Sequence, residues 1–361
     1  MKLFAEDGYR MYLASSPDEE LPSFAEENRF EYMATEMPRV PSLWKDTVAV
    51  IRICRYVRRE NIECVVGHAD KGKLLAVICG FLTGRKIVLF AHGTSFETRK
   101  GLSRKLFVAL DRVESKFASR VICVSPFLKE LRLNLGIDRP GKSYVPGKGS
   151  CCGIDVNRKF NPGNVSVDKQ TELRKSLGLN ETDFVIGFCG RIVRDKGIEE
   201  LVEAFELFKK QVNGRVKLLV VGPWDIRDGI KSSVRDIMAG DDDIILCGDV
   251  DDNIELYYSI MSLFVLPTHR DGLGLSLLEA GAMEIPVLTT GFTGSRDTII
   301  PGETGDCVTL DPQNVCAAMF SLYCSPERLA KYGKAGRKWV RDNFERTAVC
   351  RSIKECFDSM S

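Results

Sequence analysis

The sequence predicts an α/β fold of two Rossmann-like, doubly wound domains that face each other across a cleft. Short apolar runs alternate with amphipathic helical stretches along most of the 361 residues, which is typical of parallel sheets covered by helices. The runs form two series, separated by a polar segment at 158–170 that contains Pro162 and Gly163. A chain of this length accommodates two domains of about 150 residues each.

The strands are predicted from continuous apolar runs, which are typical of parallel strands buried on both faces. They lie at 10–16, 63–69, 86–93 and 120–125 in the first series, and at 183–190, 215–222, 243–248, 262–267 and 286–290 in the second. Helices are predicted at 198–212 and 312–323, among others. The predicted domains are residues 1–158 and 171–345, joined by a linker at 159–170 and followed by a helix at 346–361.

Composition narrows the class of protein. No run of 18 apolar residues and no signal peptide is present, so we expect no membrane span. Thirteen cysteines without a CxxC pair predict reduced, buried thiols and a cytoplasmic location. Residues 50–148 carry 20 basic and 8 acidic side chains, a balance of +12. This basic lobe suits an anionic membrane face or a diphosphate-bearing lipid, and we assign no nucleic-acid partner.

The most informative segment is THRDGLGLSLLEAGAMEIPVLTTG at 268–291. It predicts an acid, Asp271, on a glycine-rich turn that follows a strand, and a second acid, Glu279, two turns into a helix. A helix N-terminus after such a turn presents backbone N–H groups to a phosphate. Two carboxylates beside it are suited to sugar hydroxyls, or to general acid and base roles. The segment predicts an enzyme that handles a nucleotide-sugar.

A second phosphate-binding segment is GRIVRDKG at 190–197, between a predicted strand and a helix. Gly190 begins it, and Arg191 and Lys196 place two cations beside the helix N-terminus, which suits a diphosphate. His269, next to the acidic turn, is predicted to contact the same donor. The three successive acids at 241–243 precede a strand instead of following one, so we infer no metal site.

Polar residues also follow strands in the first domain. His92 ends the run KIVLFAH and is suited to orienting or polarising a reacting group, and His68 has a similar position. These two segments also supply Lys71, Gly93 and Thr94 as acceptor-side residues. The helix predicted at 102–120 has an apolar stripe with basic neighbours. Two interpretations stay open: it lies on a membrane surface, or it is a core helix with a basic outer face.

With these segments placed, the chain resembles the family 4 retaining glycosyltransferases of the GT-B fold, and looks closest to bacterial members that build capsular and other surface polysaccharides. The most specific parts are GRIVRDKG, the acidic pair with GLGLSLLEAGA, and TGSRDTIIPGETG. The segments HADKGKLLA, AHGTSFETRKG and GKGSCCGIDVNRKFNP also look like family segments. The resemblance covers the chain from about residue 9 to its end.

The resemblance implies a role for each segment. Arg191 and Lys196 would bind the diphosphate of the donor, which is expected to be a UDP-sugar, and Glu279 would hold its ribose. Asp271 would lie near the donor sugar, with Gly272, Leu273, Gly274 and Leu275 close to sugar and phosphate. His92 would face the reacting centre. Transfer would proceed with retention and without a bound metal, onto a polyprenyl-diphosphate-linked saccharide at the inner membrane face. The last helix would return to the first domain.

Two features depart from the family pattern. The first acid is normally Glu, whereas this chain has Asp271. Family members also begin with a buried strand and a glycine-rich loop, whereas this chain opens with the end of a helix and what looks like the second strand, so the first strand is expected to be missing. Two alternatives stay open: a nucleotide-sugar epimerase of the same fold, and a degenerate protein that binds nucleotide-sugar without turnover.

Overall fold

The computed structural model describes residues 2–38, 40–97, 99–225, 229–250 and 252–360. The chain divides into two compact units. One comprises Met1–Cys151 together with Thr347–Ser361, and the other comprises Cys152–Arg346. The domain and linker bounds that we drew from the sequence are predictions and are not taken from this division.

The N-terminal unit contains two parallel sheets. In the larger sheet β3 (Cys64–Gly67), β4 (Lys86–Ala91), β5 (Arg120–Cys123) and β6 (Ser143–Tyr144) follow one another in chain order. In the smaller sheet β1 (Tyr12–Ser15) pairs with β2 (Glu31–Ala34). Five of the six residues of β4 are buried, as expected for a parallel strand that is covered on both faces. Among the described residues, β1 pairs only with β2, and β3 only with β4.

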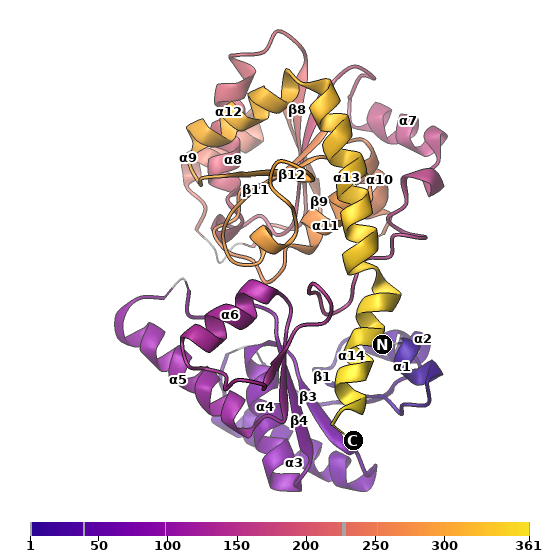
Figure 1. The fold of residues 1–361 in the computed structure, drawn as a ribbon, viewed down its shortest axis with the longest axis vertical. Helices are drawn as coiled ribbons and strands as arrows, with labels where there is room; N and C mark the ends of the chain where they lie inside the picture. Colours follow the sequence, from indigo (N-terminus) through magenta and orange to yellow (C-terminus); the bar gives the residue numbers. More distant parts are fainter. Residues whose placement is uncertain (1, 39, 98, 226–228, 251, 361) are drawn as a thin grey trace. The chain divides into compact units, whose positions relative to one another are not determined.

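Helices cover these strands in the ribbon view (Figure 1). Their bounds are α1 (Lys2–Glu6), α2 (Leu21–Glu27), α3 (Leu43–Arg59), α4 (Ala69–Thr83), α5 (Gly101–Phe117), α6 (Pro126–Asn134) and α14 (Arg346–Asp358). The last of these, drawn in yellow, packs on the strands although it ends the chain. Its Val349 and Ile353 share an apolar cluster with Val88, Phe90 and Ile122.

The C-terminal unit contains one sheet of six parallel strands. They are β7 (Phe184–Cys189), β8 (Val216–Val221), β9 (Ile244–Gly248), β10 (Leu263–Leu266), β11 (Val287–Thr290) and β12 (Gly305–Val308). Their order is β12-β11-β10-β7-β8-β9, so the chain winds outward in one direction from β7 and in the other from β10. The switch point of the doubly wound sheet therefore lies between β7 and β10, where ligands of open α/β sheets bind.

The helices of this unit are α7 (Val167–Ser176), α8 (Ile198–Lys209), α9 (Ser232–Gly240), α10 (Ile254–Ser259), α11 (Leu275–Ala282), α12 (Pro312–Tyr323) and α13 (Pro326–Phe344). Local signals set their ends. Asp311 caps α12 by accepting a hydrogen bond from the Asn314 N–H at 3.0 Å, and Pro312 occupies the first turn. Leu201, Phe205 and Phe208 form the buried face of α8.

The predicted α/β architecture with parallel, doubly wound sheets is confirmed, and each strand predicted from an apolar run is a strand. The strands named from the sequence do not include the two-residue β6, and the sequence missed β2 and β12. Both have partly exposed residues and short sequences, Glu-Tyr-Met-Ala and Gly-Asp-Cys-Val, without a continuous apolar run. Within the described ranges, no helix has both the length and the apolarity to cross a bilayer.

Candidate functional site

The candidate donor site lies at the carboxyl ends of three neighbouring strands. The loop at 190–197 follows β7, the turn at 267–274 follows β10, and the loop at 291–298 follows β11. These strands adjoin the switch point of the sheet, so the topology brings together segments about 75 residues apart in the sequence. Two segments singled out from the sequence, GRIVRDKG and the acidic turn, therefore meet here.

The central contact of this site joins Lys196 to Asp271. The Lys196 ammonium donates to one carboxylate oxygen of Asp271, and the other oxygen accepts the N–H of Gly272 at 2.8 Å. Both side chains are largely buried, with 19% and 16% exposed. Because each carboxylate oxygen has its own donor, the short Asp side chain fixes both the turn and the cation. The site thus holds a positive charge at a set position.

Further contacts fasten the loop at 190–197 to the turn, and the sequence analysis did not find them. Arg270 donates to the Asp195 carboxylate at 2.7–2.8 Å. The Asp195 carbonyl accepts both the Thr268 hydroxyl and the His269 N–H at 2.9 Å. No local pattern marks these pairs, because their members lie more than 70 residues apart.

Two glycines allow the loops to approach closely. Gly197 has a left-handed φ of +72°, and a Cβ at this position would lie 1.8 Å from the Pro267 carbonyl oxygen. Gly294 has a φ of +79°, and its Cβ would lie 2.4 Å from the Asp271 carbonyl oxygen. Only glycine combines this backbone conformation with this proximity. The site's compactness therefore depends on both residues.

The second acid, Glu279, lies in α11 and has a different partner. The hydroxyl of Tyr258, a fully buried residue of α10, donates to Glu279 at 2.9 Å. Burial raises the pKa of Glu279, while the Tyr258 hydrogen bond and the charge of Lys159 oppose that rise. The same burial raises the pKa of Tyr258. Tyr258 sits in no recognisable motif, so the sequence analysis missed it.

The remaining predicted donor residues are spread around this centre. The Arg191 side chain is 63% exposed, and its guanidinium lies 3.5 Å from Asp225. Gly190 directly follows β7, and its N–H donates to the Val221 carbonyl at 2.9 Å. The His269 imidazole lies 3.0 Å from the Glu200 carboxylate. Of the four turn residues predicted near sugar and phosphate, Leu273 is buried and Leu275 is exposed, whereas Gly272 and Gly274 shape the turn.

Two helices begin at this edge of the sheet, and they differ in charge. The first turn of α8 contains Glu199 and Glu200, which place carboxylates beside its N-terminus. The first turn of α11, which is fully described, contains no acid and follows Gly274. Since a helix N-terminus attracts anions through its free N–H groups, the N-terminus of α11 is better suited to bind a phosphate than that of α8. The sequence analysis had predicted phosphate contacts at both N-termini, with the two cations beside α8.

In the N-terminal unit, the structure pairs the two histidines singled out from the sequence. His68 Nδ1 and His92 Nε2 lie 2.9 Å apart, and His68 stacks on Phe90 with ring centroids 4.4 Å apart. Desolvation, followed by the neighbouring His92, lowers the pKa of His68 to about 4. Desolvation and then the charge of Lys73 lower the pKa of His92. At neutral pH both rings are uncharged, so one donates to the other.

The other residues predicted on the acceptor side take part in structural contacts. Lys71 lies 2.5 Å from the Asp46 carboxylate and also donates to the Pro38 carbonyl. Thr94 is buried and donates to Glu97, and Gly93 joins it to His92. The Thr94 contact lies within the loop after β4, whereas the Lys71 contacts join α4 to α3 and to the segment before it, and none of them by itself identifies an acceptor.

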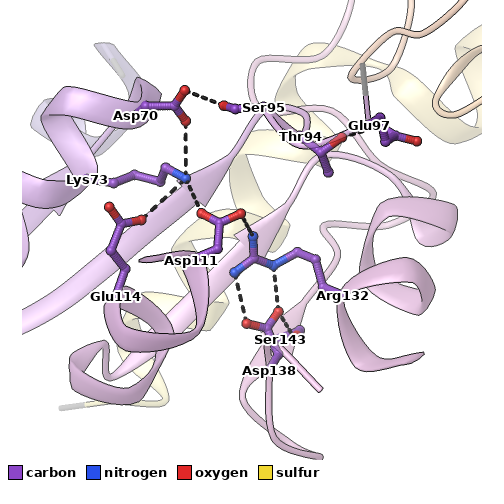
Figure 2. A network of polar contacts seen from close by, with 10 residues as sticks. All are labelled: Asp70, Lys73, Thr94, Ser95, Glu97, Asp111, Glu114, Arg132, Asp138 and Ser143. Atoms are coloured by element: carbon purple, nitrogen blue, oxygen red, sulfur yellow. Dashed lines mark hydrogen bonds and ion pairs between the residues drawn. The ribbon is translucent and has the colours of Figure 1, made fainter. Parts of the chain in front are cut away.

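A buried network of charges lies behind this loop (Figure 2). Lys73 contacts Asp111 at 2.8 Å, and Asp70 and Glu114 at 3.4 Å each. Arg132, 2% exposed, donates twice to Asp138 at 2.8 and 2.9 Å, and lies 3.4 Å from Asp111. Asp70 also accepts the hydroxyl of Ser95, so the network reaches the loop that follows His92.

Glu114 gives this network a measurable pH dependence. Burial raises its pKa to about 7, against the attraction of Lys73. A carboxyl group with a raised pKa binds its proton more tightly in the folded state, so its contribution to stability falls as pH rises from about 4.5 to about 7. Between pH 5 and pH 8, we expect the free energy of unfolding of Glu114→Gln to rise by about 1–3 kcal/mol relative to that of the unchanged protein.

Chemical denaturation of both proteins at the two pH values measures this difference. Glu63→Gln, which alters an exposed residue of the same unit, is the control and should show no such trend. A pH-independent difference for Glu114→Gln would contradict the assignment.

Two of the three acids at 241–243 form ion pairs. Asp241 accepts from Lys209, and Asp243 accepts from Lys217 at 2.8 Å. In the ranges that the structure describes, no three His, Cys, Asp or Glu side chains gather in a way suited to a metal ion.

Comparison with known families matches both parts of the chain to glycosyltransferases. Residues 169–339 match the model of glycosyl transferases group 1, and residues 1–146 match that of the glycosyl transferase 4-like domain. The capsular polysaccharide biosynthesis glycosyltransferase CapM of Staphylococcus aureus is 29% identical over 351 residues, which cover 97% of this chain and 90% of that protein.

Another relative specifies its reaction in its name. The UDP-Gal:alpha-D-GlcNAc-diphosphoundecaprenol alpha-1,3-galactosyltransferase of Escherichia coli is 27% identical over 259 residues, which cover 71% of this chain and 64% of that protein. These relatives are glycosyltransferases, and this favours sugar transfer over epimerisation as the activity of this chain.

Solved structures show the same fold. A glycosyltransferase from Rickettsia africae superposes with a TM-score of 0.83 at 18% identity, covering 99% of this chain and 92% of that one. Anabaena HepE in complex with UDP-glucose superposes with a TM-score of 0.82 at 17% identity, covering 99% and 94%. The paired parallel-sheet units of this chain are therefore those of the GT-B fold.

Proposed function

We propose that this chain, which belongs to the family 4 glycosyltransferases of the GT-B fold, moves a sugar from a UDP-sugar to a polyprenyl-diphosphate-linked saccharide with retention of configuration. The observation that carries the proposal is the Lys196–Asp271 pair, because it holds a cation at the switch point of the sheet, beside the acid-free N-terminus of α11. The relatives' names support a role in building surface polysaccharide.

The first step is recognition of the diphosphate. The N-terminus of α11, reached through Gly272–Leu275, offers N–H groups, and Lys196 and the exposed Arg191 offer charge. As the bond from the sugar to the diphosphate breaks, negative charge grows on the leaving oxygen. Preorganised cations and N–H groups stabilise that charge more in the transition state than in the ground state. These residues take the part that a metal ion plays in other transferases, so we expect turnover to persist in EDTA.

The second step places the sugar and the nucleoside. Asp271, held by Lys196, lies near the donor sugar, with His269 next to it in the same turn. Glu279 accepts hydrogen bonds from the ribose hydroxyls, and both of its oxygens are free of a competing proton only when it is ionised. His92, held by its contact with His68, is proposed as the catalytic residue of the N-terminal unit, with the acceptor-side loop around it.

The Tyr258→Phe variant tests the role of Glu279. The Tyr258 hydroxyl stabilises the ionised carboxylate, so its removal raises the pKa of Glu279 further. UDP affinity should then decline at a higher pH than in the unchanged protein as the pH is lowered, and within that decline the variant should bind UDP about fivefold to tenfold more weakly. Calorimetric titration with UDP across pH 5 to 8 measures the midpoint, with the partly buried Tyr257→Phe as the control. An unchanged midpoint would count against Glu279 as the ribose ligand.

Product analysis tests the reaction as a whole. The full chain is incubated with a panel of radiolabelled UDP-sugars and a short polyprenyl-diphosphate-linked N-acetylglucosamine, with and without EDTA. We expect label to move to the lipid, with the α configuration of the donor kept in the product as measured by NMR. A β-linked product would contradict retention, and transfer only from GDP-sugars would contradict the proposed nucleotide.

The acceptor's chemistry fixes where the enzyme works. A polyprenyl-diphosphate saccharide is confined to a membrane, whereas nucleotide-sugars are dissolved in the cytoplasm. We therefore propose peripheral attachment to the inner face of the cytoplasmic membrane, favoured by the basic balance of residues 50–148.

A further inference from the structure

Helix α5 has its two acidic residues inside and a stripe of large apolar residues outside. Asp111, Glu114 and Ser115 are its buried residues. Leu102, Leu106 and Val113 are 83%, 57% and 53% exposed. A helix that belongs to an ordinary core has the reverse arrangement, with its apolar stripe packed against the sheet. The sequence alone left open whether the stripe was core or surface, and the structure places it on the surface of the N-terminal unit.

Ion pairs fix this orientation. Asp111 contacts Lys73 at 2.8 Å and Arg132 at 3.4 Å, and Glu114 contacts Lys73 at 3.4 Å (Figure 2). Lys73 is itself buried, so a rotation of α5 about its axis would leave its ammonium with only the 3.4 Å contact to Asp70, and it would take Asp111 away from the buried Arg132. The apolar stripe therefore stays on the outside for as long as the network is intact.

The exposed stripe runs the whole length of the helix. Its residues recur at helical spacing and lie within one narrow arc, and Phe117 meets Phe81 of α4 edge to face, with ring centroids 5.4 Å apart. At 1.5 Å per residue, the stripe is roughly 22 Å long. We call these residues the α5 surface: Leu102, Leu106, Leu110, Val113 and Phe117 of α5, with Phe81 of α4.

Cations accompany the stripe. The segment from 99 to 117 contains six basic residues, Arg99, Lys100, Arg104, Lys105, Arg112 and Lys116, all exposed. Its only acids after residue 98 are Asp111 and Glu114, which face inward. An exposed apolar stripe beside unopposed cations has the composition of a helix that lies in the interface of an anionic membrane.

We propose that the α5 surface lies in the headgroup region of an anionic bilayer, with its apolar side chains reaching the acyl boundary and the flanking cations on the lipid phosphates. A second copy of the chain is the poorer occupant, because a two-fold contact through this surface would set one row of cations against its symmetry mate. The role of this surface, which is access to a lipid-linked acceptor, rests on the proposed function. Lipid binding itself needs no sugar transfer.

Vesicle flotation with the full chain tests this inference. The probes are vesicles of phosphatidylcholine alone and vesicles that also contain one quarter phosphatidylglycerol, in 0.1 M salt. We expect binding to the anionic vesicles, weakened by about tenfold or more with phosphatidylcholine alone. Leu106→Gln/Leu110→Gln should weaken anionic binding by about tenfold or more, and Lys105→Gln/Lys116→Gln should weaken it and reduce its salt dependence.

The matched control is Val167→Gln, which alters a 73% exposed apolar residue at the start of α7 in the C-terminal unit and should bind as the unchanged protein does. A second, direct readout is Leu106→Trp, whose fluorescence should shift to the blue on anionic vesicles. Circular dichroism and thermal midpoints check that each variant is folded.

Two results would overturn the proposal. One is equal vesicle binding by the unchanged protein and Leu106→Gln/Leu110→Gln, or no binding by either. The other is a dimer in gel filtration that the same variant converts to a monomer without any vesicle binding. UDP titration of the same samples separates the two proposals: UDP binding without lipid binding removes only this inference, whereas lipid binding without UDP binding removes the donor site.

Discussion

Replacement of Lys196 by Met is expected to lower the rate of sugar transfer by about 10²–10³-fold. Lys196 is fixed by Asp271 at the carboxyl edge of the sheet, so its charge needs no reorganisation when the diphosphate leaves. Loss of such a preorganised charge is felt mainly in the transition state, so the effect should appear in kcat more than in UDP affinity. Steady-state transfer and UDP titration measure the two quantities separately.

The matched control is Arg194→Met. Arg194 is a cation of the same loop, is exposed, and lies two residues away, so the variant removes the same charge from the same region. We expect transfer within about twofold of the unchanged protein, since a surface charge contributes little. Equal losses for both variants would indicate a general field effect, and full activity of Lys196→Met would exclude Lys196 from the leaving-group site.

The largest effect on stability is expected for Gly197→Ala, a loss of about 3–5 kcal/mol. The added Cβ would lie 1.8 Å from the Pro267 carbonyl oxygen, a contact that only a backbone shift can relieve. Such a shift would move the loop that carries Lys196 away from the turn that carries Asp271. Donor binding should therefore fail together with stability.

Gly178→Ala isolates the part of this loss that comes from backbone conformation. Gly178 has a φ of +67°, close to the +72° of Gly197, and a Cβ there would have no neighbour within 4 Å. This variant should lose about 1–2 kcal/mol and keep its UDP affinity. Urea denaturation of both variants gives the difference. Similar losses would show that the close approach to Pro267 does not matter.

Much of the fold was predictable because its strands are buried on both faces. Runs such as Phe184–Cys189 and Leu263–Leu266 are apolar throughout, and each is a strand. The short strand Glu31–Ala34 was missed because it has no continuous apolar run, and two of its four residues are exposed. Its place is set by pairing with Tyr12–Ser15, which local sequence does not report.

The site was predictable only in part, for a related reason. Lys196 and Asp271 were each found from a local motif, but their mutual contact spans 75 residues of sequence and depends on strand order. Tyr258 was missed because a buried tyrosine in a short helix has no pattern of its own. The outward stripe of α5 could not be assigned either, because a stripe of this kind fits a core or a surface. Its direction was decided by Lys73 and Arg132, which come from other helices.

The measurement that tests the account most directly is UDP binding by calorimetry to the unchanged chain, Arg191→Ala, Glu279→Ala and the loop control Arg194→Ala. The account predicts that UDP binds, that the first two variants weaken binding by about tenfold or more, and that Arg194→Ala does not. Absence of binding to UDP, GDP and ADP alike, or equal affinity in all four proteins, would contradict a donor site at the switch point of the C-terminal sheet.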